Sequence, residues 1–167
     1  MDCFKDAAAH TLKGLMYHRE FEDYMRFLGF DNLADMQRKR YLEESNTFAC
    51  INTEYIKLTG KLLNFDTPAY ESVIPKSWYD YDIDDVDNNT RRNYLKSLFV
   101  LWINWERETI TLYEKIISHC HSTGQEEFNI FFDSCLKDTH KELQKAESLW
   151  TKFEMCEWTP LDILLIM

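Results

Sequence analysis

Residues 99–113 read FVLWINWERETITLY, and this stretch decides the fold class that the sequence predicts. Five residues follow one another at the three- and four-residue spacings that place side chains on one face of an α-helix: Phe99, Trp102, Glu106, Thr109 and Tyr113. Glu106 falls on the same face, between the aromatic residues. No glycine or proline interrupts the stretch, so it predicts a long helix whose apolar face contains one carboxylate.

Composition extends this prediction to the whole chain. Its 167 residues include only 4 glycines and 3 prolines, and a scarcity of chain-breaking residues favours long helices over strands. Hydrophobic residues make up 45% and aromatic residues 15%, which excludes intrinsic disorder. No segment alternates polar and apolar residues with the period of a strand. We therefore predict an all-α fold in a single domain over residues 1–167.

The charge of the chain and its cysteines bear on partners and location. A formal net charge of −10 gives no long-range attraction to nucleic acids or anionic membranes, so neither is an expected partner. The first residues include acids and no apolar run, unlike a secretory signal, and no stretch approaches the roughly 20 apolar residues of a membrane span. Five cysteines without a CxxC pair suit free thiols in a reducing compartment. The expected location is the cytoplasm.

Four helical segments are expected, separated by connections of unequal length. Their ranges are 4–28, 33–63, 88–121 and 125–153. Short connections join the first segment to the second and the third to the fourth, and such connections make antiparallel neighbours. The connection at residues 64–87 is long enough to run the full length of a helix. The predicted topology is two antiparallel hairpins joined by one long crossover, with a C-terminal tail at residues 154–167.

Carboxylates inside the apolar stripes need an explanation, because a lone buried carboxylate is costly. Three of the expected stripes contain one each: Glu44, Glu106 and Glu142. Acidic oxygens from three helices at similar depth would make a site for a hard cation. The alternative is that each glutamate reaches solvent at the edge of its stripe, or pairs with Arg19, Arg38 or Arg40.

Polar residues near the inner side of the first segment add to this set. They are His10, Thr11, His18 and Glu22. His18 and Glu22 are one helical turn apart, and a histidine and a carboxylate so spaced can bind one metal ion or bond to each other. The alternative is that the histidines are core residues whose nitrogen atoms find hydrogen-bond partners within the protein.

Three segments resemble the bacterial non-haem ferritins, a family of four-helix proteins. Glu43-Glu44, after the turn at residues 29–34, is similar to the beginning of that family's second helix. Residues 105–111 (WERETIT) resemble its third-helix His-Glu-Arg/Gln segment, and residues 138–142 (DTHKE) its fourth-helix Glu-Gln-His-Glu-Glu segment. The resemblance covers almost the whole chain, including the helix order, the crossover and the subunit length. It implies a ferritin-like bundle.

The resemblance also implies a diiron ferroxidase centre, which would oxidise Fe(II) for iron storage. The family's ligands on the second, third and fourth helices fall on Glu44, Glu106, Thr139 and Glu142. Its second-helix histidine falls on Thr47, and its first-helix glutamate on His10 or Thr11. A complete Glu-x-x-His motif is therefore absent from this chain.

Two outcomes follow from these departures. In the first, a metal site is rebuilt around the three interior glutamates. Its further candidate ligands are His10, His18, Glu22 and His140. Iron is the expected metal, with manganese or zinc as alternatives, and Tyr17 or Tyr24 would supply an electron or a hydrogen bond. In the second, the metal centre is lost and the chain is a metal-free four-helix structural or protein-interaction module.

Aromatic residues in the crossover and near the C-terminus exceed what four helices need internally. They include Trp78, Tyr79, Tyr81 and Trp158. Aromatic residues commonly anchor contacts between subunits. We expect self-association to a dimer at least, with a cage as the larger alternative, and metal ions as the other partners.

Overall fold

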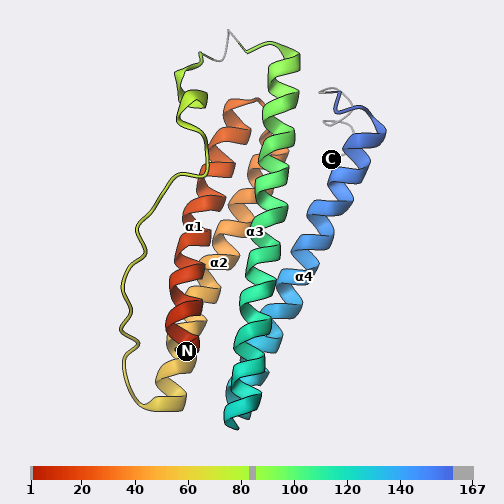
Figure 1. The fold of residues 1–167 in the computed structure, drawn as a ribbon. Helices are drawn as coiled ribbons and strands as arrows, with labels where there is room; N and C mark the ends of the chain where they lie inside the picture. Colours follow the sequence, from red (N-terminus) through yellow and green to blue (C-terminus); the bar gives the residue numbers. More distant parts are fainter. Residues whose placement is uncertain (1, 83–85, 160–167) are drawn as a thin grey trace.

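The computed structural model describes residues 2–82 and 86–159, in which four long helices lie side by side (Figure 1). Their bounds are α1 (Cys3–Phe27), α2 (Asp31–Thr59), α3 (Asn88–Thr123) and α4 (Glu126–Met155). A short 3-10 helix, η1 (Lys76–Asp80), lies between α2 and α3. No strand occurs in either described range, so the predicted all-α fold with four helices is confirmed.

Capping groups and glycines set the ends of the helices. Asp87 begins α3, because its side chain accepts a hydrogen bond of 2.7 Å from the backbone N–H of Thr90. α2 ends at Thr59, earlier than the expected residue 63. The reason is Gly60, whose left-handed backbone (φ 68°) turns the chain out of the helix while its N–H donates to the carbonyl of Ile56.

The crossover lies against α1. The backbone contacts of the bundle run mainly along α1 with α2 and along α3 with α4, and α1 also contacts α3. Figure 1 shows residues 61–82 running along the outside of α1 from one end of the helices toward the other. Glu20 of α1 accepts a 3.0 Å hydrogen bond from the N–H of Val73, and the Tyr24 hydroxyl donates to the carbonyl of Trp78 at 3.0 Å. These two bonds attach the crossover to α1.

Two hydrophobic clusters fill the interior, one toward each end of the helices. The first, here the Phe99 cluster, has among its buried members Phe21, Met25, Leu33, Leu95, Phe99, Trp102 and Phe153. The second, here the Phe132 cluster, has among its buried members Phe4, Ile51, Tyr113, Ile116 and Phe132. Residues from all four helices contribute to this apolar interior, whose burial is the main driving force for folding.

Trp158 completes the Phe99 cluster. Its side chain is fully buried against Phe99 and Phe153, and its indole N–H donates to a carboxylate oxygen of Glu154 at 2.7 Å. The expectation that Trp158 anchors a contact between subunits is therefore wrong, since its own bundle covers it. The rest of the expected tail, residues 160–167, lies outside the described residues.

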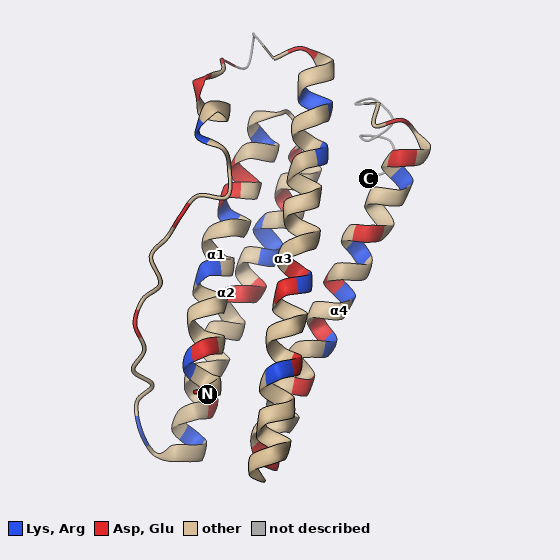
Figure 2. Ribbon diagram, viewed as in Figure 1, with Lys and Arg blue, Asp and Glu red and all other residues tan. Residues whose placement is uncertain are grey.

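Charged positions of both signs are spread along the helices (Figure 2). Many form ion pairs within one helix, such as Lys137 with Asp133 and Lys141 with Asp138. Exposed pairs of this kind contribute little to stability. None of the helices in the described ranges combines the length and the apolar character needed to cross a membrane.

Gly14 permits the close approach of α1 to α3. A Cβ atom at this position would lie 3.0 Å from Cζ2 of Trp105. The Trp105 ring cannot move aside easily, because it is stacked on the His10 ring at 4.1 Å and meets the Tyr17 ring edge-on at 4.7 Å.

We expect Gly14→Ala to lower the free energy of unfolding by about 1 kcal/mol, because the overpacking penalty exceeds the gain in helix propensity. Ser45→Ala, at an exposed position of α2, is the matched control and should leave stability unchanged or slightly raised. Urea denaturation followed by circular dichroism measures both. A Gly14→Ala variant more stable than the wild type would contradict the packing described here.

Candidate functional site

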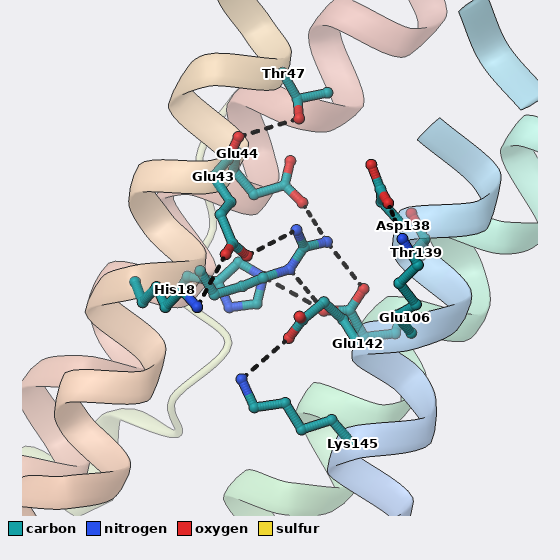
Figure 3. Close-up of polar contacts among 12 residues, drawn as sticks. His18, Glu43, Glu44, Thr47, Glu106, Asp138, Thr139, Glu142 and Lys145 are labelled. Carbon is teal, nitrogen blue, oxygen red and sulfur yellow. Dashed lines mark hydrogen bonds and ion pairs between the residues drawn. The ribbon is translucent and has the colours of Figure 1, made fainter. Parts of the chain in front are cut away.

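A layer of buried polar side chains separates the Phe99 cluster from the Phe132 cluster. On α2, α3 and α4 these residues fall between the members of the two clusters in the sequence. They are Gln37, Arg40, Glu44, Glu106, Thr109 and Thr139. His18 of α1 joins them, and its side chain is fully buried. We call this set the polar layer. In Figure 3, Glu44, Glu106 and Glu142 project from α2, α3 and α4 toward a common region.

Arg40 occupies the centre of the polar layer. Its Nε and Nη2 atoms donate to the two carboxylate oxygens of Glu106, each at 3.2 Å. Nη2 also lies 2.7 Å from Oε1 of Glu44. The side chains of all three residues are almost completely buried. A guanidinium that bonds a carboxylate with two parallel N–H groups makes one of the stronger polar interactions available in a protein.

Further donors and a neutral histidine surround Glu106. The indole N–H of Trp102 donates to Oε1 of Glu106 at 3.2 Å. Nε2 of His18 lies 3.8 Å from the same oxygen, and Nδ1 lies 2.8 Å from the amide oxygen of Gln37. This second contact is a hydrogen bond between the imidazole and the Gln37 side chain, whereas Nε2 of His18 has no hydrogen-bond partner among the described residues. Burial, together with the charge of Arg40, lowers the pKa of His18 to about 3.

When Glu44 and Glu106 are both ionised, the polar layer has a net negative charge, because the single guanidinium of Arg40 faces two carboxylates. Burial raises the pKa of Glu44 to about 7, and the neighbouring carboxylates of Glu106, Glu43 and Glu142 act in the same direction against the opposing charge of Arg40. A proton on Glu44 near neutral pH makes the layer neutral overall, which lowers the cost of burying it.

A cavity gives Glu44 access to protons. It has a volume of about 210 Å³ and is lined by residues of α2, α3 and α4, including Arg40, Glu44 and Tyr113. Exposed residues also line it, among them Cys50 and Asp138, so the cavity reaches the surface. Glu44 can therefore exchange its proton with solvent without opening the bundle.

His10 and Tyr17, two other predicted site residues, lie around Trp105. The Thr109 hydroxyl donates to the carbonyl of Trp105 at 2.9 Å and lies 2.7 Å from Nε2 of His10. Since the hydroxyl proton is used, His10 donates to Thr109. Burial lowers the pKa of His10 to about 4, with a smaller effect from the charge of Lys13. His10 and Tyr17 thus make packing and hydrogen-bond contacts around one indole ring.

The remaining predicted site residues lie outside the centre of the polar layer. Glu22 is buried but pairs with Arg19 at 3.1 Å and with Arg26 at 3.6 Å. His140 is exposed on α4. The hydroxyl of Tyr24 is bonded to the crossover, and burial raises its pKa.

The resemblance to ferritins places metal ligands at Glu142, Thr47 and Thr139. Glu142 lies at the edge of the layer, where its carboxylate is 3.6 Å from Nζ of Lys145. Thr47 and Thr139, at positions where the ferritin family has ligands, donate their hydroxyl protons to backbone carbonyls of their own helices at 3.1 and 3.0 Å. Within the described ranges, no group of three or more His, Cys, Asp and Glu side chains is arranged to hold a metal ion. Because Arg40 already binds the two innermost carboxylates, these residues do not fit a diiron centre.

Sequence reasoning identified the glutamates but could not choose their partner. Arg40 was one of three arginines considered, and Gln37 and the indole N–H of Trp102 were missed as members of the network. One local signal was available, because Arg40 precedes Glu44 by one helical turn, a spacing that favours an ion pair.

Comparisons with known proteins assign no family. No protein-family model matches the chain, and no match was found among curated proteins. Functional inference therefore depends on the geometry of the polar layer and of the surface.

We expect Arg40→Met to lower the free energy of unfolding by about 3–5 kcal/mol, because it leaves the buried carboxylate of Glu106 without its counter-charge and without the two hydrogen bonds from the guanidinium. The triple variant Arg40→Met/Glu44→Leu/Glu106→Met removes all three charges and should recover most of that loss. Urea denaturation measures both. Equal loss in the single and triple variants would show that side-chain packing, rather than charge pairing, is the main contribution of Arg40.

The pKa of Glu44 predicts how stability depends on pH. Between its ordinary value of 4.5 and about 7, the unfolded chain has released the Glu44 proton while the folded chain keeps it, so a rising pH favours unfolding. Across this window, wild-type stability should fall by about 3 kcal/mol relative to that of Glu44→Gln. Glu114→Gln, at an exposed position of α3, should follow the wild type. Parallel pH profiles for wild type and Glu44→Gln, from urea denaturation, would refute the assignment.

Proposed function

We propose that this chain is a ferritin-like four-helix bundle that acts as a metal-independent structural or protein-interaction module. The observation that carries the proposal is the position of Arg40. Its guanidinium bonds Glu106 through two N–H groups and lies 2.7 Å from Glu44, so the positive charge that a metal ion would supply comes from the chain itself.

The course of the chain supports the ferritin-like topology. α1 packs along α2 after a short turn at Gly29, and α3 packs along α4 after a short turn at Gly124. Short turns between helices that pack together favour two antiparallel hairpins. The crossover, which runs along α1 between α2 and α3, also supports this topology (Figure 1).

The departures from the ferritin ligand set support a metal-independent role. Thr47 and Thr139 satisfy their hydroxyl groups within their own helices, and Glu142 pairs with Lys145. Fe(II) oxidation and iron storage remain a prediction of the resemblance alone. The cytoplasmic location likewise remains a prediction from the sequence.

Self-association, to a dimer at least, is the interaction that we propose for this module. Several large apolar side chains on α2 and immediately after it are exposed: Leu42, Ile56 and Leu62. Ile130 of α4 is exposed as well. The proposal requires that some of these side chains form a contiguous apolar patch, since such patches mark contacts with other proteins, whereas single exposed residues do not.

Metal loading tests the metal-independent role. The melting temperature of the wild-type protein should stay unchanged with anaerobic Fe(II), Mn(II) or Zn(II), and desalting should leave no stoichiometric metal. In Arg40→Ala, the side chains of His18, Glu44 and Glu106 lose the guanidinium between them, and a bound cation should raise the melting temperature by several degrees. Differential scanning fluorimetry and elemental analysis provide the two readouts.

Arg40→Lys is the matched control, because it keeps the positive charge and should not gain a response to metal. Stoichiometric metal in the wild-type protein that is lost in Glu106→Gln would overturn the proposal and favour the carboxylate metal site.

A further inference from the structure

A cavity lined by aromatic rings lies between α1 and the crossover. Its volume is about 270 Å³. Its lining consists of Glu20, Asp23, Tyr24 and Phe27 of α1, with Trp78, Tyr79 and Tyr81 of η1 and the residues after it. It is distinct from the polar layer, with which it shares no residue.

The rings in this cavity are inclined to one another. Tyr24 lies 5.2 Å from Trp78 with an interplanar angle of 37°, and 6.2 Å from Tyr79 with an angle of 78°. Phe27 lies 5.4 Å from Tyr24 at 46°. Because the rings are inclined to one another, they border the cavity and do not form a single stack that would fill it.

Two contacts hold the rings in place without a ligand. Trp78 is stacked at 4.3 Å on Tyr94 of α3, which is not one of the lining residues. The Tyr24 hydroxyl donates to the carbonyl of Trp78. The cavity is therefore largely preformed, which reduces the entropy lost when a ligand binds.

The charge of the cavity is negative. Glu20 and Asp23 are the ionisable acids of its lining, and the described lining residues include no lysine or arginine. Glu20 accepts from the N–H of Val73, and Asp23 lies 3.1 Å from Arg19, which is half-exposed. The faces of aromatic rings are also electronegative. The carboxylates and the rings thus favour a cation.

The kind of cation follows from the lining, which is mostly aromatic and whose two carboxylates already bond the N–H of Val73 and the guanidinium of Arg19. Hard metal ions require several oxygen ligands, and a primary ammonium requires acceptors for its three N–H groups. A quaternary ammonium group has no N–H, spreads its charge over methyl groups and binds to ring faces. The volume is below the range typical of sites for drug-sized ligands, so it suits a small head group.

We propose that this aromatic cavity binds a quaternary ammonium group of the choline type. Tyr24, Trp78 and Tyr79 contact the methyl groups, and Asp23 supplies long-range attraction at the mouth. The site goes beyond the metal-independent role of the bundle, and it would remain if the metal-loading test failed.

Choline chloride, titrated into the full chain by isothermal calorimetry, tests the site. Saturable binding at millimolar concentration is expected. The neutral isostere 3,3-dimethyl-1-butanol has the same shape without the charge and should bind at least tenfold more weakly. Equal binding of the two compounds, or no saturable binding of choline, would overturn the proposal.

Variants assign the binding to this cavity. Tyr79 is 58% exposed, so Tyr79→Leu should fold normally while weakening choline about threefold or more, and Tyr79→Phe should retain affinity. Asp23→Asn should weaken binding about twofold and reduce its dependence on salt. Tyr41→Leu, on α2 outside the cavity, is the matched control and should bind as the wild type does.

Sedimentation velocity of the same variants distinguishes a second copy of the chain as the occupant. Self-association that Tyr79→Leu abolishes, without choline binding by the wild type, would assign the aromatic rings to a subunit contact and overturn the site. Choline binding that neither Tyr79→Leu nor Asp23→Asn weakens would also overturn it.

Discussion

The guanidinium of Arg40 is buried between two carboxylates that come from different helices, Glu44 of α2 and Glu106 of α3. Removing such charges from water costs several kcal/mol for each ion, and the cost is offset only when the geometry is good and the remaining hydrogen bonds are made. The neighbouring polar residues meet this requirement in part. The indole N–H of Trp102 donates to Glu106, and Gln37 forms a hydrogen bond with His18 beside it. Nε2 of His18 and the amide nitrogen of Gln37 have no hydrogen-bond partner among the described residues.

The same interaction joins the two halves of the bundle. Backbone contacts run mainly within the pairs α1–α2 and α3–α4. Apolar packing also resists displacement, but a shift within it leaves no charge unpaired. The bond from Arg40 on α2 to Glu106 on α3 has fixed directions and cannot slide by a turn without leaving charges unpaired. We infer that the polar layer sets the register of the pairs, at some cost in the stability that an entirely apolar core would give.

The sequence predicts the helices well and their polar interior only in part. Apolar spacing and scarce glycines are local signals, so helix number and most helix ends follow from them. Gly60 lies inside an apolar pattern, and only its left-handed backbone reveals that α2 ends there. The partner of the glutamates depends on how α2 is rotated toward α3, which no local pattern records. Trp158 was misassigned for a similar reason, because positive φ angles at Glu157 and Trp158 return the chain to the core.

A guanidinium differs from a metal ion in ways that matter for function. It cannot dissociate or change oxidation state, and the charges of Glu106 and Glu44 raise its pKa further above the usual value despite burial. Under the proposed role, the guanidinium of Arg40 and a proton on Glu44 neutralise the polar layer without a metal ion. What remains variable is the proton on Glu44, which reaches solvent through the adjoining cavity. Loss of this proton changes the net charge of the polar layer by one unit near neutral pH. A metal centre would instead change by gaining or losing its metal ion. The polar layer would thus respond to pH through one proton, in keeping with the metal-independent role proposed above.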